Sequence, residues 1–118
     1  MNEQRVEIGI HYPGAVISVN HYKHKWYTKR ECKDWMLLLE WMVKEYHIED
    51  WKLPLTVRCS GVFKDKRSTP DLSNLSKVVL DALEEVSGVN DRNMRWQDGD
   101  ISYGDNPELT IEIIGGNQ

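Results

Sequence analysis

The segment from Pro70 to Leu83 constrains the fold more than any other part of the chain, because it separates into two sides at the spacing of a helix. At about 100° per residue, its polar side chains fall on one flank and its apolar side chains on the other. The polar flank consists of Asp71, Asn74, Lys77 and Asp81. The apolar side, continued for one more turn, consists of Leu72, Leu75, Val79, Ala82, Leu83 and Val86. We therefore predict a helix that docks by its apolar side and leaves its polar side to contact another molecule.

Hydrophobic periodicity divides the rest of the chain into strands and one further helix. Alternating apolar residues predict strands, whereas apolar residues that recur every three or four positions predict a helix. The predicted elements are a strand at 6–10, a helix at 29–47, a strand at 55–63, the second helix from about 69 to 88, an extended stretch at 94–103 and a strand at 109–113. Their number and the length of 118 residues favour a single domain over residues 1–118. Its predicted architecture is an α+β two-layer sandwich in the order β-α-β-α-β-β, with both helices packed on one face of a four-stranded mixed sheet.

The charge composition restricts how the chain can bind nucleic acid. The net charge is −4 at pH 7, which does not fit binding by overall positive charge, so a polyanion must be met by a local basic patch. One candidate patch is Lys64-Asp65-Lys66-Arg67, and a second runs from His21 to Arg30, where basic residues are interleaved with aromatic ones. Both patches are as consistent with ordinary solvated loops as with a DNA contact.

Apolar runs and cysteine usage indicate where the protein works. No apolar run approaches the roughly 18 residues that a membrane span needs, and no apolar stretch follows a basic head at the N-terminus. We therefore expect no membrane partner and a cytoplasmic location. Cys32 and Cys59 each fall in phase with apolar neighbours, which predicts two reduced thiols in the core.

The motif residues of the second helix and of the turn after it resemble those of the RusA-type Holliday junction resolvases. The chain reads Pro-Asp-Leu-Ser-Asn-Leu-Ser-Lys from Pro70, Leu-Asp-Ala-Leu from Leu80, and then Asn90-Asp91. The family pattern is Asp-x-Asp-Asn-Leu-x-Lys, then Asp-Ala-Leu, then Asp-Asp. Further similarities, which extend the resemblance over most of the chain, lie at Asn20, Tyr22, Tyr103, Gly104 and Pro107.

The resemblance implies a homodimeric endonuclease that uses Mg²⁺ or Mn²⁺ to cut paired strands of branched DNA at four-way junctions, in DNA recombination and repair. By position in the motif, Asp71 and Asp91 match catalytic aspartates and Lys77 matches the catalytic lysine. Carboxylate oxygens are the hard ligands that Mg²⁺ prefers, and the metal can acidify a water for attack on phosphorus. Lys77 would offset charge on the phosphate as it transfers, with Asn74 and Asp81 as supporting residues.

The candidate DNA contacts come from the two basic patches and from the resemblance in the N-terminal loop. They are Lys64, Lys66, Arg67, Asn20, Tyr22, Lys23 and Lys25. Two nicks on a two-fold symmetric junction call for two sites related by the same axis, which agrees with a homodimer.

Ser73 is the main departure from the family pattern, because it stands where the family carries its second catalytic aspartate. A hydroxyl can ligate Mg²⁺ or hold a metal-bound water, so Ser73 joins Asp71 and Asp91 as a candidate metal ligand. Losing one anion from a site of about three should nevertheless weaken metal binding. Asn90 likewise replaces an acid, and residues 100–108 are acidic where family members usually place several Lys and Arg, which predicts weaker DNA contact.

Two other functions stay open at the level of the sequence. The first is a catalytically weakened or inactive relative that recognises branched DNA or a protein partner, motivated by Ser73. The second is a structural dimer that does not touch DNA, motivated by the negative net charge. The motif residues also have a purely structural interpretation, in which Asp71 only caps the helix, Lys77 and Asp81 form an exposed ion pair, and Asp91 is a turn residue.

Overall fold

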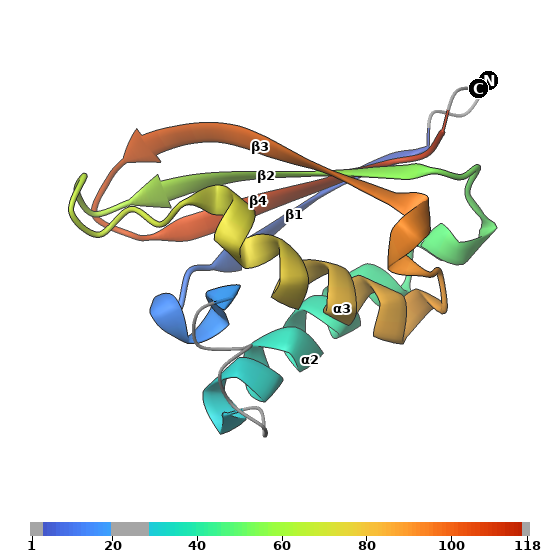
Figure 1. Ribbon diagram of the computed structural model, residues 1–118, viewed down its shortest axis with the longest axis horizontal. Helices are drawn as coiled ribbons and strands as arrows, with labels where there is room; N and C mark the ends of the chain where they lie inside the picture. The colour runs from blue at the N-terminus through green and yellow to red at the C-terminus, as the bar shows by residue number, and fades with distance from the viewer. Residues whose placement is uncertain (1–3, 20–28, 117–118) are drawn as a thin grey trace.

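The computed structural model describes residues 4–19 and 29–116. In this part of the chain a four-stranded sheet forms one layer and two α-helices form the other (Figure 1). The strands are β1 (Arg5–His11), β2 (Leu55–Phe63), β3 (Met94–Tyr103) and β4 (Glu108–Ile114), and the helices are α2 (Arg30–Lys44) and α3 (Ser76–Ser87). Both helices cover the same face of the sheet (Figure 1). The predicted α+β class and the order β-α-β-α-β-β are confirmed.

The sheet is mixed, as predicted, and its strand order is β1-β4-β2-β3. β4 pairs antiparallel with both β1 and β2, whereas β2 and β3 are parallel. The β2–β3 register shifts between Cys59 and Gly61, which marks a bulge. At the facing Gly99, an added Cβ would overlap the Ser60 hydroxyl and the Cys59 carbonyl group, so the close approach of the two strands requires glycine there.

The hydrophobic core lies between the sheet and the two helices. Trp35 of α2 is only 2% exposed, and its Nε1–H donates to the carbonyl oxygen of His11 at 2.9 Å, which ties α2 to the end of β1. Cys32 and Cys59 are both free and buried, which confirms the predicted core thiols. The pKa of Cys59 is raised to about 12, mainly because the thiol is buried and to a smaller extent because of the charge of Asp98. The core thiols are therefore protonated at neutral pH and have low reactivity as nucleophiles.

Both predicted helices have different bounds in the structure. The second was predicted to begin near Thr69, but a 3₁₀ turn, η3 (Leu72–Leu75), comes first and α3 begins at Ser76. Side chains in this segment hydrogen-bond the local backbone, as when the Ser76 hydroxyl donates to the Ser73 carbonyl oxygen at 2.8 Å, and such bonds compete with a regular helix start. The first helix ends at Lys44 and does not reach His47, which adopts a left-handed conformation with φ 49° that a helix cannot contain. Among the described residues, no helix is both long and apolar enough to cross a membrane.

Candidate functional site

Asp71 and Ser73 form a small exposed polar group at the start of η3. Asp71 is the N-cap, and its Oδ1 accepts hydrogen bonds from the backbone N–H of Ser73 at 3.2 Å and from the Ser73 hydroxyl at 2.9 Å. The interpretation of Asp71 as a cap is therefore confirmed, although the element that it caps is the 3₁₀ turn η3 and not α3 itself. Thr69 instead donates its hydroxyl to the carbonyl oxygen of Asp65 at 2.8 Å. A carboxylate at this position is held in place by Ser73 and faces solvent.

Lys77 and Asp81 lie one turn apart on one side of α3. Lys77 Nζ lies 3.1 Å from Asp81 Oδ1, one helical turn further along, and the two side chains are 45% and 24% exposed. Such an exposed i,i+4 pair stabilises a helix only slightly, by about 0.3–0.5 kcal/mol. The ammonium group can therefore exchange this partner for a phosphate at little energetic cost.

Asp91 lies beyond the other end of α3. Gly88 ends the helix in a left-handed conformation with φ 76°, which turns the chain back toward the last turn. Asn90 then caps the short turn η4 (Asp91–Asn93), and the backbone N–H of Asp91 donates to Glu84 Oε1 at 2.8 Å. The carboxylate of Glu84 is thereby fixed next to Asp91. The sequence analysis did not single out Glu84, although an acid in the last turn of a helix, shortly before Asn90-Asp91, is a visible signal.

A single protomer does not bring Asp71 and Asp91 together. Because β2 and β3 are parallel, the chain that leaves β2 must travel back along the sheet before β3 can begin, and α3 makes this return (Figure 1). Asp71 precedes α3 and Asp91 follows it. The 12 residues of α3 make a helix about 18 Å long. This separation is far greater than the few ångströms between two ligands of one metal ion.

The basic loop that follows β2 lies next to Asp71 in the chain. Lys64, Lys66 and Arg67 are all exposed. Asp65 shapes this loop by accepting the backbone N–H of Ser68 at 2.8 Å, and hydrogen bonds from Ser68 lower the pKa of Asp65. The predicted DNA contacts Asn20, Tyr22, Lys23 and Lys25 lie outside the described residues.

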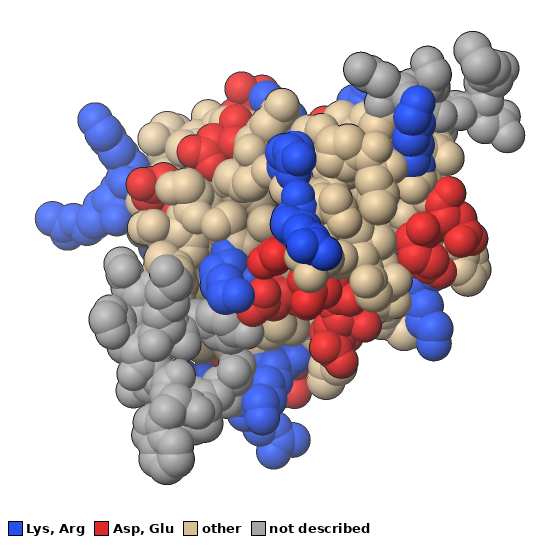
Figure 2. Space-filling model, turned by 45° about the vertical axis from the view of Figure 1, so that its right-hand side comes forward, with Lys and Arg blue, Asp and Glu red and all other residues tan. Residues whose placement is uncertain are grey.

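Acidic side chains gather where α2 and α3 lie side by side. The groove between these helices is lined by Glu40, Asp81, Glu84 and Glu85 together with Lys33, Met36 and Leu37. The pKa of Glu40 is raised, mainly by burial and to a smaller extent by the negative charge of Glu85. The face seen in Figure 2 has a cluster of acidic side chains at its centre with basic side chains around it.

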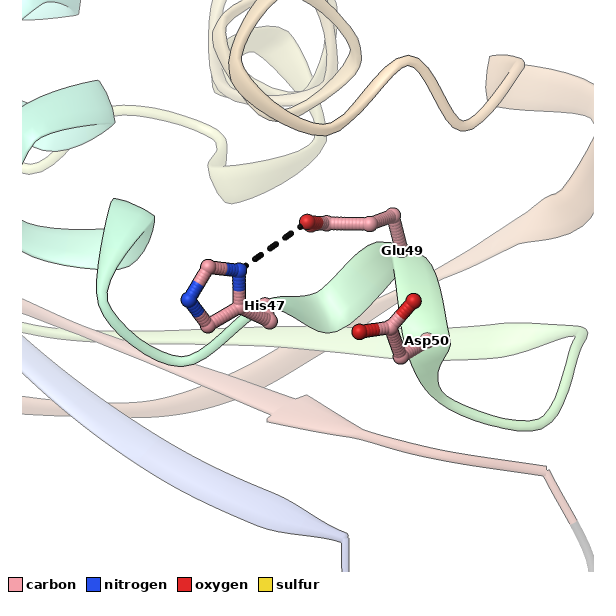
Figure 3. Close-up of side chains that lie close together, drawn as sticks. All are labelled: His47, Glu49 and Asp50. Atoms are coloured by element: carbon pink, nitrogen blue, oxygen red, sulfur yellow. Dashed lines mark hydrogen bonds and ion pairs between the residues drawn. The ribbon is translucent and has the colours of Figure 1, made fainter.

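A second group of possible metal ligands lies in the turn before β2. The ligand atoms of His47, Glu49 and Asp50 fall within 4.8 Å of one another, and all three residues are exposed (Figure 3). His47 Nδ1 lies 3.2 Å from Glu49 Oε2, and the pKa of Glu49 is lowered first by its own backbone N–H and then by His47. Exposed acidic groups of this kind are common without an ion, so the cluster alone identifies no site. It shares no residue with the motif that contains Asp71 and Asp91.

Comparison with protein-family models shows which family the sequence matches. The sequence model of the family described as endodeoxyribonuclease RusA matches residues 15–114, which is most of the chain. The matched range includes both ends of α3 and every motif residue discussed above. No curated protein matches the chain.

Proposed function

Because the chain belongs to the RusA endodeoxyribonuclease family, we propose that it is a metal-dependent nuclease that resolves Holliday junctions by hydrolysing paired phosphodiester bonds, in DNA recombination and repair. The family match over residues 15–114 is the observation that carries this proposal. Its branched DNA substrate implies a cytoplasmic location. Lys64, Lys66 and Arg67 are the proposed DNA contacts of the described residues, because they are exposed and lie just before Asp71 in the chain.

The donor set at both ends of α3 fits a magnesium or manganese ion. Asp71 and Asp91 are exposed carboxylates, and the Ser73 hydroxyl adds a third hard oxygen. A bound ion would supply a water of lowered pKa and would polarise the phosphate. Lys77 would leave Asp81 to offset negative charge on the phosphate, and Asn74, which is partly buried beside Asp71 and Ser73 in the chain, would support them.

Formation of a homodimer would bring an Asp71 and an Asp91 from different protomers close together. If two protomers place their α3 helices antiparallel about a two-fold axis, the start of each α3 lies beside the end of its partner. Asp71 of one protomer and Asp91 of the other could then hold one ion, and the dimer would contain two such sites. This arrangement also gives the two related active sites that a symmetric junction requires.

The direct experiment compares a labelled four-way junction with a linear duplex of the same sequence, in Mg²⁺, in Mn²⁺ and in a chelator. We expect nicks in the junction strands with either metal, little cleavage of the duplex, and no cleavage in the chelator. Gel retardation on the same samples measures binding separately from cutting. Metal-independent cleavage, or equal cleavage of both substrates, would contradict the proposal.

Ser73 supports one alternative, a relative that binds branched DNA without cutting it. Its hydroxyl bonds Asp71 at 2.9 Å in place of a second carboxylate, so this end of the site has one negative charge fewer. A protein of this kind would retard the junction in the gel but leave it uncut. High salt should release it, because phosphate contacts weaken steeply as salt rises.

Ser73→Asp should strengthen metal binding, because it restores a carboxylate next to Asp71. One added anionic ligand is expected to raise the affinity for Mn²⁺ by about tenfold, equivalent to about 1.4 kcal/mol. Titration calorimetry with Mn²⁺ measures this change, and the junction assay shows whether nicking rises with it. Ser76→Asp is the matched control, since it adds the same charge at the start of α3, where the native hydroxyl contacts a carbonyl oxygen and not Asp71. Equal affinity of the Ser73→Asp variant and the unmodified protein would show that Ser73 does not limit metal binding.

A further inference from the structure

We propose that Glu84 supplies a carboxylate to the metal site at Asp91 and replaces the negative charge that is missing at Ser73. This inference rests on the proposed function, because it assumes that Asp91 is a metal ligand. Neither the family match nor the motif assigns a role to Glu84.

The local geometry holds the Glu84 carboxylate against the backbone of Asp91. Its Oε1 accepts the backbone N–H of Asp91 at 2.8 Å, across the turn that Gly88 opens. A carboxylate has a second oxygen with lone pairs of its own, so one oxygen can position Asp91 while the other contacts a cation. Glu84 is also partly buried, which restricts its side chain more than that of a fully exposed glutamate.

The position of Glu84 in the last turn of α3 also supports a bound cation. The C-terminus of a helix carries partial negative charge, so an acid in the last turn is unfavourable there. α3 has no basic residue in its last turn, yet it has both Glu84 and Glu85 close to its end. A cation bound next to Asp91 would offset the charge of Glu84 and the helix dipole.

The count of negative charges also agrees with this assignment. Of the two ligand candidates that precede α3, Asp71 and Ser73, Asp71 provides a carboxylate and Ser73 a neutral hydroxyl. In the proposed dimer, Asp91 and Glu84 of the second protomer would raise the total to three carboxylates. This restores the anionic charge that the family motif achieves with a second aspartate near Asp71.

Glu85 provides a matched comparison within the same helical turn. Glu85 lines the groove between α2 and α3, as Glu84 does, and its charge acts on Glu40. Among the described residues, however, a hydrogen bond joins Asp91 to Glu84 and none joins it to Glu85. Removing the charge of Glu85 therefore changes the overall charge of the protein as much as a change at Glu84 would, but at a different place.

The test measures Mn²⁺ affinity by titration calorimetry for the unmodified protein, Glu84→Gln, Glu85→Gln and Asp91→Asn. Glutamine keeps an oxygen that can accept the Asp91 N–H and loses only the charge. We expect Glu84→Gln to weaken Mn²⁺ binding about tenfold, Glu85→Gln to change it less than twofold, and the Ser73→Asp/Glu84→Gln double variant to recover the lost affinity. Thermal unfolding in a chelator verifies that each variant is folded.

Three results would separate the inference from the function on which it rests. If Asp91→Asn weakens Mn²⁺ binding and Glu84→Gln does not, Glu84 is not part of the metal site, whereas the proposed function stands. If Glu84→Gln and Glu85→Gln weaken binding equally, the effect is one of overall charge and the inference fails. If Asp91→Asn leaves Mn²⁺ binding unchanged, the proposed metal site itself is wrong.

Discussion

Asp71→Asn and Asp91→Asn should each abolish junction nicking, whereas a heterodimer of the two variants should regain it. Residues that merely support a metal ligand already contribute about 10- to 100-fold to affinity or activity, so loss of a ligand should lower nicking by at least about 100-fold. Each variant homodimer lacks one ligand at both composite sites. A heterodimer has one site with both aspartates intact and one site with neither.

The measurement uses two affinity tags to isolate the heterodimer from cells that express both variants. We expect about half the nicking rate of the unmodified dimer, and single nicks in place of paired cuts, because one of two symmetry-related sites works. A heterodimer of the unmodified chain with the Asp71→Asn chain is the control, since one intact site is expected there in any arrangement. If the control is active and the Asp71→Asn/Asp91→Asn heterodimer is not, the two aspartates do not meet across a dimer.

Trp35→Ala should destabilise the protein severely, because Trp35 fills the space between α2 and the sheet and is 2% exposed. Removing a buried tryptophan side chain typically costs about 3–5 kcal/mol, a large share of the roughly 5–15 kcal/mol that stabilises a domain. The variant also loses the hydrogen bond from Trp35 Nε1 to the His11 carbonyl oxygen. Urea denaturation followed by circular dichroism gives the change in the free energy of unfolding.

Trp41→Ala is the matched control, since Trp41 lies on the same helix and is 75% exposed. A surface substitution of this kind usually changes stability by less than about 0.5 kcal/mol. Trp35→Phe separates the hydrogen bond from the packing, because the smaller ring fills most of the space and leaves the His11 carbonyl oxygen without its donor. Similar losses for Trp35→Ala and Trp41→Ala would contradict the packing that places α2 on the sheet.

The sequence predicted the elements well because burial on one face imposes a period on the chain. β2 alternates between buried and partly exposed residues along its whole length, as a strand with one face against the helices must. The helix bounds were less predictable, since they depend on local hydrogen bonds. The 3₁₀ turn between Asp71 and Ser76 and the left-handed His47 arise from side-chain and backbone contacts that periodicity does not encode.

The identities of the candidate ligands also follow from the sequence. Asp71, Ser73, Lys77 and Asp91 stand at motif positions, and the resemblance to the family that they suggested agrees with the match over residues 15–114. The capping of η3 by Asp71 was likewise predictable, because residue type and the following apolar run suffice for it. Their individual roles remain predictions for the experiments above.

The tertiary structure alone decided where these residues lie relative to one another. The spacing of Asp71 and Asp91 in the chain is compatible with neighbours or with opposite ends of a helix, and the parallel pairing of β2 and β3 selects the second. The turn at Gly88, which ends α3, brings the backbone of Asp91 to the Glu84 carboxylate. Sequence periodicity reports which face of an element is buried, but strand pairing between distant segments sets the direction in which each element runs, and therefore which ends meet.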